Sequence, residues 1–286
     1  MNTVTCLLNK NQIEKLRQTF ADALVDTPPA YALYQLKVEN CTITAYTSNK
    51  VVFQGKEAEI YAAAFQSVPS FEAHGGSDEV GTGDYFGPVC VCACIVTEKD
   101  KALLDQLKVR DSKQMTDKDM IVIGPQLMQQ LQHSLLIVDN PKYNRIHKTC
   151  NLNQIKAMLH NQAYLNLINK GFSLPPLVVI DQFTPEVSYY RYLQKEKKIV
   201  QGLHFETKAE NKYTAVACAS IIARYGFLKY WEAMEQQHQM SFTKGAGSKV
   251  DKDGVTFVQR YGFDKLGQVA KLHFKNTTNI QNTIQE

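Results

Sequence analysis

An aperiodic stretch rich in proline, glycine and serine, SVPSFEAHGGS at residues 67–77, divides the 286-residue chain into two parts with different periodicity. Such a stretch is typical of a domain boundary, because few contacts cross it. We therefore place a boundary near residues 68–75 and expect two domains, residues 1–70 and residues 74–286. At 44% hydrophobic residues, a chain of this length supports a small domain and a large one.

The first part has the pattern of a small α+β domain. Four runs alternate with period two and resemble strands: NTVTCLLN, YALYQLKV, CTITAYT and KVVFQG. Between the first two we expect a helix that opens with a capping box of Asn11 and Glu14, carries Leu24 on its apolar side and ends at Pro28. KEAEIYAAAFQ predicts a closing helix. The order β-α-β-β-β-α predicts one sheet face covered by helices and one free face.

The second part alternates strand-like runs with helical ones. The strand-like runs are PVCVCACIVT, HSLLIVD and LPPLVVID, and Cys90, Cys92 and Cys94 fall on one face of the first. The helical runs are EKDKALLDQL, NLNQIKAMLHNQAYLNLINK and a long segment from Tyr213 to about Gln237. This alternation predicts an α/β domain in which helices flank a sheet.

The sequence also indicates where the protein acts. No stretch approaches the roughly 18 uncharged apolar residues of a membrane span, and the first residues lack the pattern of a secretory signal. Seven cysteines without a C-x-x-C pair suit a reducing compartment. We therefore expect a cytoplasmic protein with no membrane partner.

The densest motif, GGSDEVGTGDYFG, places two adjacent carboxylates, Asp78 and Glu79, directly before a glycine turn, Gly81-Thr82-Gly83. Glycines at such a turn allow backbone amides to approach a ligand closely. Taken alone, the motif is more typical of a solvated acidic loop with a hairpin turn, because such glycine tripeptides are common.

Two further acids occupy positions where chemistry is common. Asp181 ends the apolar run LPPLVVID, at the carboxyl end of a strand, where α/β sheets present functional side chains. Glu210 precedes a helix whose small residues permit close packing on the sheet: Ala217, Ala219, Ser220 and Ala223. The alternatives are a helix cap for Asp181 and a favourable helix-dipole position for Glu210.

If the four acids converge, they require a compensating cation. Oxygen-only ligands point to Mg²⁺ or Mn²⁺, and two such ions activate water and stabilise the leaving oxygen in phosphodiester hydrolysis. Residues 191–212 carry six basic side chains against three acidic ones, and the loop FTKGAGSKVDK at 242–252 is also basic. These features favour a metal-dependent nuclease with a phosphate-rich substrate.

Four motifs in this order resemble those of the type 2 ribonucleases H: SDEVGTGDYFGPV at 77–89, RDSKQMT at 110–116, VVIDQF at 178–183 and TKAENKYTAVACASIIARYGFL at 207–228. The resemblance covers residues 74–286. Within that group the chain is most similar to ribonuclease HIII. KAEN has glutamate where the ribonuclease HII pattern has aspartate, and Gly-Thr-Gly replaces Gly-Arg-Gly.

This resemblance implies a ribonuclease H-like catalytic domain with a mixed sheet flanked by helices. Before it the family carries a small α+β domain resembling the TATA-binding protein fold, which helps to hold the hybrid duplex. The implied activity is that of a metal-dependent endoribonuclease that hydrolyses the RNA strand of RNA/DNA hybrids. The products would carry 5′-phosphate and 3′-hydroxyl ends.

The resemblance also implies roles for individual residues. The family's four catalytic acids, which would hold two Mg²⁺ or Mn²⁺ ions, match Asp78, Glu79, Asp181 and Glu210. The turn that reads ribose 2′-hydroxyls through backbone groups matches Gly81, Thr82 and Gly83, and a motif near the substrate phosphates matches Ser112 and Lys113. Nothing in the sequence requires more than a monomer.

Three alternatives differ in chemistry. A ribonuclease HII-like enzyme would cleave at single embedded ribonucleotides. A sugar-kinase or actin-like ATPase would use the glycine turn for phosphate, but no second phosphate loop or adenosine-binding glycine pair follows Asp181. A hybrid-binding protein without catalysis would lack one of the four acids, and none is missing.

Overall fold

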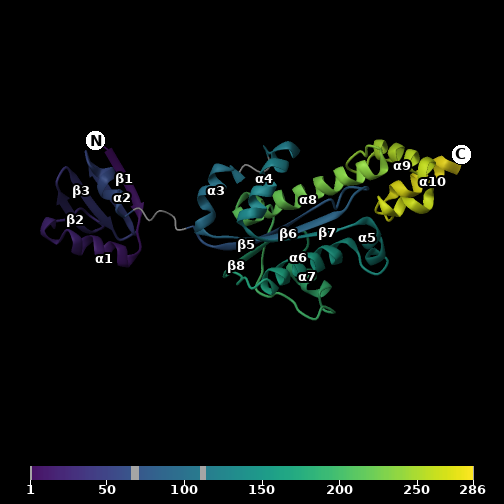
Figure 1. Cartoon of the computed structure of the whole chain (residues 1–286). Helices are drawn as coiled ribbons and strands as arrows, with labels where there is room; N and C mark the ends of the chain where they lie inside the picture. Colours follow the sequence, from purple (N-terminus) through teal and green to yellow (C-terminus); the bar gives the residue numbers. More distant parts are fainter. Residues whose placement is uncertain (1, 66–70, 110–113, 286) are drawn as a thin grey trace. The chain divides into compact units, whose positions relative to one another are not determined.

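The computed structural model describes residues 2–65, 71–109 and 114–285, which form two compact units (Figure 1). The first unit comprises the described residues up to 65, and the second begins at Phe71. Within these described ranges, no helix combines the length and apolar character needed to cross a membrane.

The first unit is an α+β domain with a four-stranded antiparallel sheet of order β1-β4-β3-β2. Its elements are β1 Asn2–Leu7, α1 Lys10–Thr19, β2 Ala32–Val38, β3 Cys41–Tyr46, β4 Lys50–Gly55 and α2 Ala58–Ala63. Both helices contribute to one apolar core, in which Leu16, Leu36 and Phe53 are fully buried. The predicted order of elements is therefore confirmed.

The predicted start and end of the first helix are wrong. Asn9 caps α1: its side chain accepts from the Gln12 amide at 2.9 Å, and the Gln12 side chain accepts from the Asn9 amide at 2.9 Å. With this cap, Leu8 and Ile13 flank the helix start as a buried hydrophobic pair. If Asn11 were the cap, the two corresponding positions would be occupied by Lys10 and Lys15, which cannot form such a pair. The helix ends at Thr19, and Leu24 instead pairs with Leu36 in an isolated bridge.

The second unit is built on a five-stranded mixed sheet of order β7-β6-β5-β8-β9. Its strands are β5 His74–Val80, β6 Val89–Val96, β7 Gln132–Val138, β8 Leu177–Asp181 and β9 His204–Glu206. Strands β5, β6 and β7 pair antiparallel, whereas β8 runs parallel to both β5 and β9. The mixed sheet is confirmed, although β5 and β9 were not predicted as strands.

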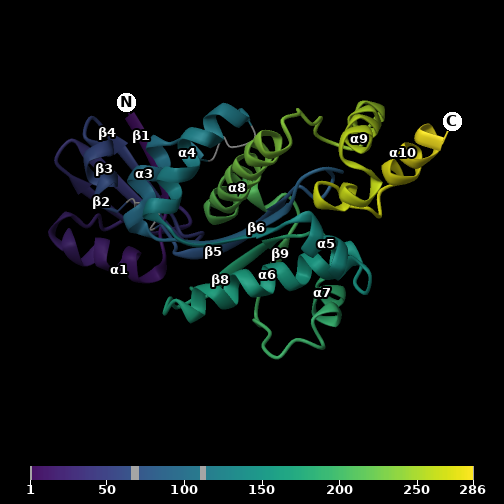
Figure 2. The same ribbon diagram turned by 45° about the vertical axis from the view of Figure 1, so that its right-hand side comes forward.

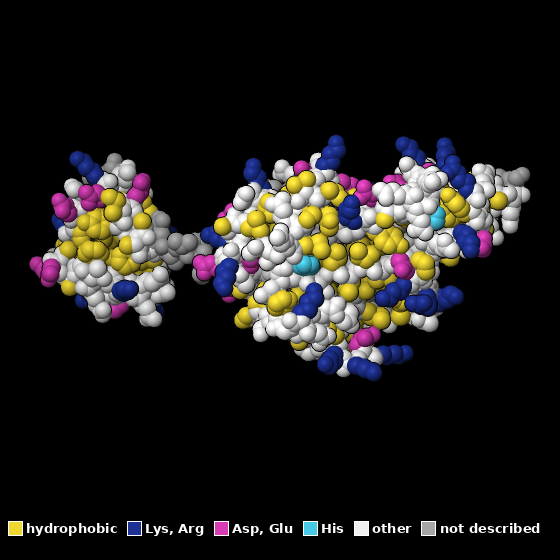
Figure 3. Space-filling model, viewed as in Figure 1, with side chains coloured by type: hydrophobic (Ala, Val, Ile, Leu, Met, Phe, Trp, Pro, Cys, Tyr) yellow, Lys and Arg dark blue, Asp and Glu magenta, His cyan; other side chains and the backbone are white. Residues whose placement is uncertain are grey.

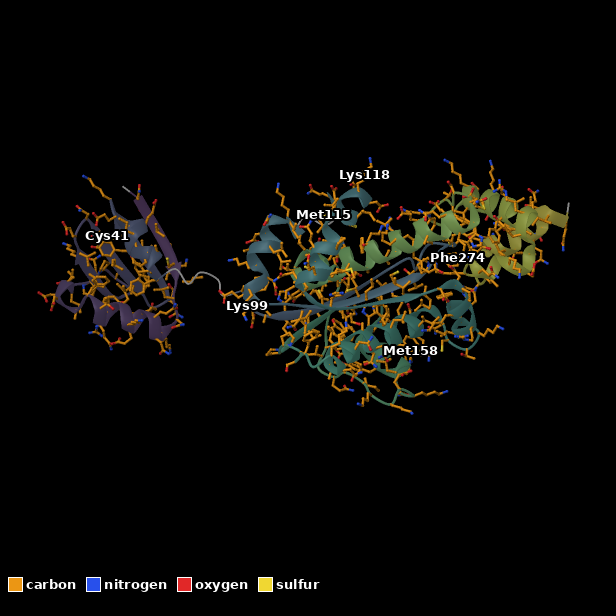
Figure 4. All side chains as sticks on the ribbon, in the orientation of Figure 1. Cys41, Lys99, Met115, Lys118, Met158 and Phe274 are labelled. Carbon is orange, nitrogen blue, oxygen red and sulfur yellow. The ribbon has the colours of Figure 1, made fainter. Side chains whose placement is uncertain are left out.

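Helices cover both faces of this sheet, as Figure 2 shows for α8 and α6. One layer contains α3 Lys101–Gln106, α4 Asp117–Gln130 and α8 Thr214–His238, and the other contains α5 Asn140–His147, α6 Leu152–Asn169 and α7 Glu186–Tyr192. Met115 and Met158, labelled in Figure 4, lie on opposite sides of the sheet. The C-terminal segment adds α9 Ser248–Tyr261 and α10 Lys275–Gln285.

Strand β6 is buried along its whole length. As predicted, Cys90, Cys92 and Cys94 share one face, and they belong to the core that includes α8. Val89 and Val91 point to the opposite core, which includes α6. Strand β6 is therefore dry on both faces.

Helix α8 packs unusually close to β5. A Cβ atom at Gly76 would lie 2.3 Å from the Val216 nitrogen and 2.5 Å from the Ala215 carbonyl carbon, so no side chain fits there. This approach agrees with the close packing predicted from the small residues of the helix. This close approach of α8 to β5 also affects the site, because both elements carry polar side chains a few residues further along the chain.

Replacing Gly76 by alanine is expected to lower the free energy of unfolding by about 2–3 kcal/mol, since the added methyl meets backbone rather than a movable side chain. Urea unfolding followed by the fluorescence of Trp231, the sole tryptophan, reports this unit. Gly247→Ala is the control, because nothing lies within 4 Å of its added Cβ. Equal midpoints for the two variants would contradict the prediction.

Candidate active site

Asp78 and Glu79 lie near the carboxyl end of β5 and leave the strand on opposite faces, as neighbouring strand residues must. Asp78 points to the α8 side, where the Ser220 hydroxyl donates to it. Glu79 points to the α6 side, where it contacts Lys156 and His160. The Glu79 amide also donates to the Asp78 carboxylate at 2.8 Å.

Asp181 ends β8, the parallel neighbour of β5. Because Ser77 pairs with Ile180, the next residue of each strand, Asp78 and Asp181, emerges at the same end of the sheet. The Ala209 amide donates to Asp181 at 2.9 Å and so fixes the 3₁₀ turn Ala209–Asn211, which contains Glu210. Three distant segments thus bring the four predicted acids to one sheet end.

The acids influence one another electrostatically. Burial, followed by the charge of Glu79, raises the pKa of Asp78 to about 7, although hydrogen bonds from Ser220 and the Glu79 amide oppose the rise. Burial also raises the pKa of Asp181, against the hydrogen bond from Ala209, and the charges of Glu210 and Glu79 add to the rise. Such a cluster favours a bound cation.

Lys156 and His160 are two site residues that the sequence analysis missed. They stand four residues apart on α6, so they share one helical face, and both are buried. Burial would raise the pKa of Glu79, but the hydrogen bonds and charges of His160 and Lys156 outweigh it and hold the pKa below its ordinary value. The available signal was the four-residue spacing of a lysine and a histidine, which places both on one face of the predicted helix.

The donor set of this sheet end fits a divalent cation that prefers oxygen. All four predicted ligands are carboxylates, and no thiol or imidazole is needed. In the part of the chain that the structure describes, no three His, Cys, Asp or Glu side chains already form a close metal cage.

The predicted glycine turn directly follows the β5 acids. Gly81 has a φ of +90°, and a Cβ atom there would lie 2.2 Å from the Pro88 carbonyl oxygen. Thr82 is half-buried, and Gly83 is exposed with open space around it. The turn therefore offers backbone groups to solvent beside the acids.

A buried lysine of the C-terminal segment holds the loop that follows this turn. The Lys271 ammonium donates to the carbonyl oxygens of Asp84 at 2.7 Å, Phe86 at 3.3 Å and Gly87 at 2.7 Å. The Lys271 amide also donates to the Tyr85 carbonyl at 2.8 Å. The position of the turn thus depends on residues almost 200 positions later in the chain.

The predicted basic residues have different environments. Lys195, Lys197 and Lys198 are exposed on the loop after α7, where Figure 3 shows Lys and Arg side chains gathered. The predicted loop at 242–252 is wrong in its second half, because residues 248–252 belong to α9, and Lys244 pairs with Asp117 at 2.7 Å rather than standing free. Ser112 and Lys113, predicted near substrate phosphates, lie outside the described residues.

Comparison with known proteins agrees with this architecture. A family model described as Ribonuclease HII matches residues 75–277, and one described as Domain of unknown function (DUF3378) matches residues 3–74. The fold and the family match place the second unit among the type 2 ribonucleases H, which are endoribonucleases.

The relatives narrow this class further. Ribonuclease HIII of Bacillus anthracis is 39% identical, and the alignment covers 96% of this chain and 97% of that protein. The crystal structure of Bst-RNase HIII in complex with Mn²⁺ is 36% identical with a TM-score of 0.72, and 99% of each chain is covered. The chain belongs to the ribonuclease HIII family.

The wider class shares the catalytic fold. The ribonuclease H2 of Pyrococcus horikoshii OT3 is 22% identical with a TM-score of 0.62, covering 75% of this chain and 99% of that one. The shorter coverage reflects a likeness in fold over only part of this chain.

Proposed function

We propose that this chain is an endonuclease that hydrolyses the RNA strand of RNA/DNA hybrids with two Mg²⁺ or Mn²⁺ ions, leaving 5′-phosphate and 3′-hydroxyl ends. The observation that carries the proposal is the convergence of Asp78, Glu79, Asp181 and Glu210 at one end of the sheet. Mn²⁺ is bound in the related Bst-RNase HIII structure, which supports the choice of cation.

The four acids would have different roles, which follow from their positions. Asp78 and Asp181, at adjacent strand ends, would hold the ions most directly, and Glu79 and Glu210 would complete the sites and orient the attacking water. When bound, such ions supply an activated water and stabilise the leaving oxygen. Ser220 and the Ala209 amide orient Asp78 and Asp181, respectively.

The glycine turn would select RNA. Its exposed backbone groups lie beside the acids, where they reach ribose 2′-hydroxyls without reading bases. We also assign Ser112 and Lys113 to substrate phosphates, on the motif alone. A monomeric state and a cytoplasmic location stay predictions from the sequence.

Thr82 predicts a preference for runs of ribonucleotides, because it stands where the ribonuclease HII pattern has arginine. A duplex with a single embedded ribonucleotide is expected to be cut much more slowly than a full hybrid. Initial rates on the two substrates, at equal concentration and ionic strength, measure this preference. Equal rates would favour the ribonuclease HII-like alternative.

We assign hybrid binding to the free sheet face of the first unit. Cross-strand pairing aligns Thr3, Gln54, Thr42 and Lys37 in one row, with Thr5 and Gln35 in the next. Hydroxyl and amide groups on a flat face suit contacts to a sugar-phosphate backbone, and the near-neutral charge of this unit favours short-range contacts.

Cleavage of an end-labelled RNA/DNA hybrid, beside RNA/RNA and DNA/DNA duplexes of the same sequence, tests the function. We expect cleavage of the hybrid alone, only with Mg²⁺ or Mn²⁺, and none after chelation. A hybrid that is bound but never cut, with any divalent cation, would identify a binding protein instead. ATP turnover in the same preparation would point to the ATPase alternative.

A further inference from the structure

The two carboxylate oxygens of Glu79 contact two different side chains of one helix, α6. Lys156 donates to Oε1, and His160 Nε2 contacts Oε2 at 2.8 Å. The side chains are enclosed, with exposed fractions of 12% for Glu79, 10% for Lys156 and zero for His160. Because a carboxylate only accepts hydrogen bonds, Nε2 must be the donor.

Both partners are themselves fixed. The other imidazole nitrogen of His160 shares a hydrogen bond with the Ser77 hydroxyl at 2.7 Å. The Phe183 ring stacks on the His160 ring at 5.3 Å, and the Lys156 ammonium lies 4.0 Å from the centroid of the same ring. Phe183 follows Asp181 by two residues. This packing therefore connects Lys156 and His160 of α6 to strand β8, which ends at Asp181.

Charge neutralisation alone does not explain this arrangement. One cation suffices to neutralise one carboxylate, and a buried ion pair generally stabilises a fold no better than apolar residues of similar volume. A fixed direction for both oxygens, by contrast, has a use at this position. Glu79 leaves β5 on the face opposite to Asp78, so its carboxylate needs a constraint to serve the same sheet end.

We propose that Lys156 and His160 are positioning residues that orient the Glu79 carboxylate toward the divalent cation of the nuclease. This inference rests on the proposed function, because it takes Glu79 as a metal ligand. Each oxygen keeps lone pairs beyond its protein contact, so orientation and cation binding are compatible. Groups that orient metal ligands typically alter metal affinity by about 10- to 100-fold.

Calorimetric titration of the full chain with Mn²⁺, without nucleic acid, tests the inference. Lys156→Met and His160→Leu are expected to weaken Mn²⁺ binding by about 10- to 100-fold. Lys156→Arg and His160→Gln, which keep a donor, should recover most of the affinity. Lys170→Met is the matched control, since this exposed lysine ends the same helix and bonds only the His133 carbonyl among the contacts described. Its affinity should equal that of the wild type.

Glu79→Gln separates positioning from a general structural effect. In that background, Lys156→Met should weaken Mn²⁺ binding no further, because the two changes act through the same carboxylate. The same loss in both backgrounds, or wild-type affinity for Lys156→Met alone, would overturn the inference. Ser77→Ala keeps every charge and removes the hydrogen bond to His160, together with one to the buried Tyr164. It provides a second test if a lysine variant fails to fold. We expect it to weaken Mn²⁺ binding, and unchanged binding would count against the inference.

The steady-state kinetics distinguish failure of this inference from failure of the proposed function. We expect the Mn²⁺ concentration for half-maximal cleavage to rise in Lys156→Met, while KM for the hybrid stays the same. If the wild type cleaves hybrids with metal but the variants match it, only the inference is wrong. If the wild type neither binds Mn²⁺ nor cleaves, the proposed function falls as well.

Discussion

Asp78→Asn is expected to abolish hybrid cleavage, by at least about 1,000-fold, and at the same time to stabilise the protein. The loss follows because several kcal/mol of transition-state stabilisation depend on a cation bound by this carboxylate, and each 1.4 kcal/mol is about tenfold in rate. The gain in stability follows because burial raises the pKa of Asp78 to about 7 from an ordinary 3.8. Ionised Asp78 therefore opposes folding.

The direction of the Asp78 pKa shift sets the pH range in which this stability difference appears. Between pH 3.8 and about 7 the folded state binds the proton more tightly than the unfolded state, so the wild type loses stability as the pH rises through this window. Asparagine does not titrate. The gain in unfolding free energy from Asp78→Asn should thus be small near pH 4 and reach roughly 2 kcal/mol at pH 8. This value is below the free energy that the whole pKa shift would give, because Asp78 is partly exposed.

Urea unfolding in chelator, at both pH values, measures this difference, and labelled-hybrid cleavage measures the activity. Asp264→Asn is the control, since that side chain is 75% exposed, and it should change neither quantity. Cleavage by Asp78→Asn within tenfold of the wild-type rate would remove Asp78 from the catalytic set. A variant that is inactive but less stable at pH 8 would contradict the electrostatic account.

Lys271→Met is expected to cost about 3–5 kcal/mol of unfolding free energy, the largest stability effect among these substitutions. The ammonium is fully buried and bonds three carbonyls; without it those of Asp84 and Phe86 lose this donor, whereas Asn140 still donates to that of Gly87. Burial lowers the pKa of Lys271 to about 7, so the buried charge itself opposes folding and offsets part of the gain from the hydrogen bonds. The comparison belongs at pH 6, where all three N–H bonds are present. Methionine keeps the length of the chain but no donor.

The consequences of Lys271→Met should extend to the glycine turn. The bonded carbonyls lie just after Gly83, so a loosened loop is expected to raise KM for the hybrid. Trp231 fluorescence during urea unfolding reports the stability of this unit. Lys265→Met, at an exposed lysine, should stay within about 0.5 kcal/mol of the wild type. A comparable midpoint for both variants would show that the carbonyl contacts contribute little.

The sequence alone determined the order of elements in the first unit, three of the five strands of the second unit and the choice of the four candidate acids. Period-two runs, polar turns and glycines are local signals, because they depend on residues a few positions apart. They predicted the four strands of the first unit and β6, β7 and β8 of the second. The acids were recognisable because each stands at a strand end or before a helix, within an ordered set of motifs.

Only the tertiary structure decided what those acids touch. Whether β5 pairs with β8, which brings Asp78 beside Asp181, depends on contacts between distant segments that no local pattern encodes. The same holds for the capping residue Asn9, which the burial of Leu8 and Ile13 favours over Asn11. It holds most clearly for Lys156 and His160. Their partner Glu79 lies some 80 positions earlier, and only the packing of α6 on the sheet turns a helical lysine and histidine toward it.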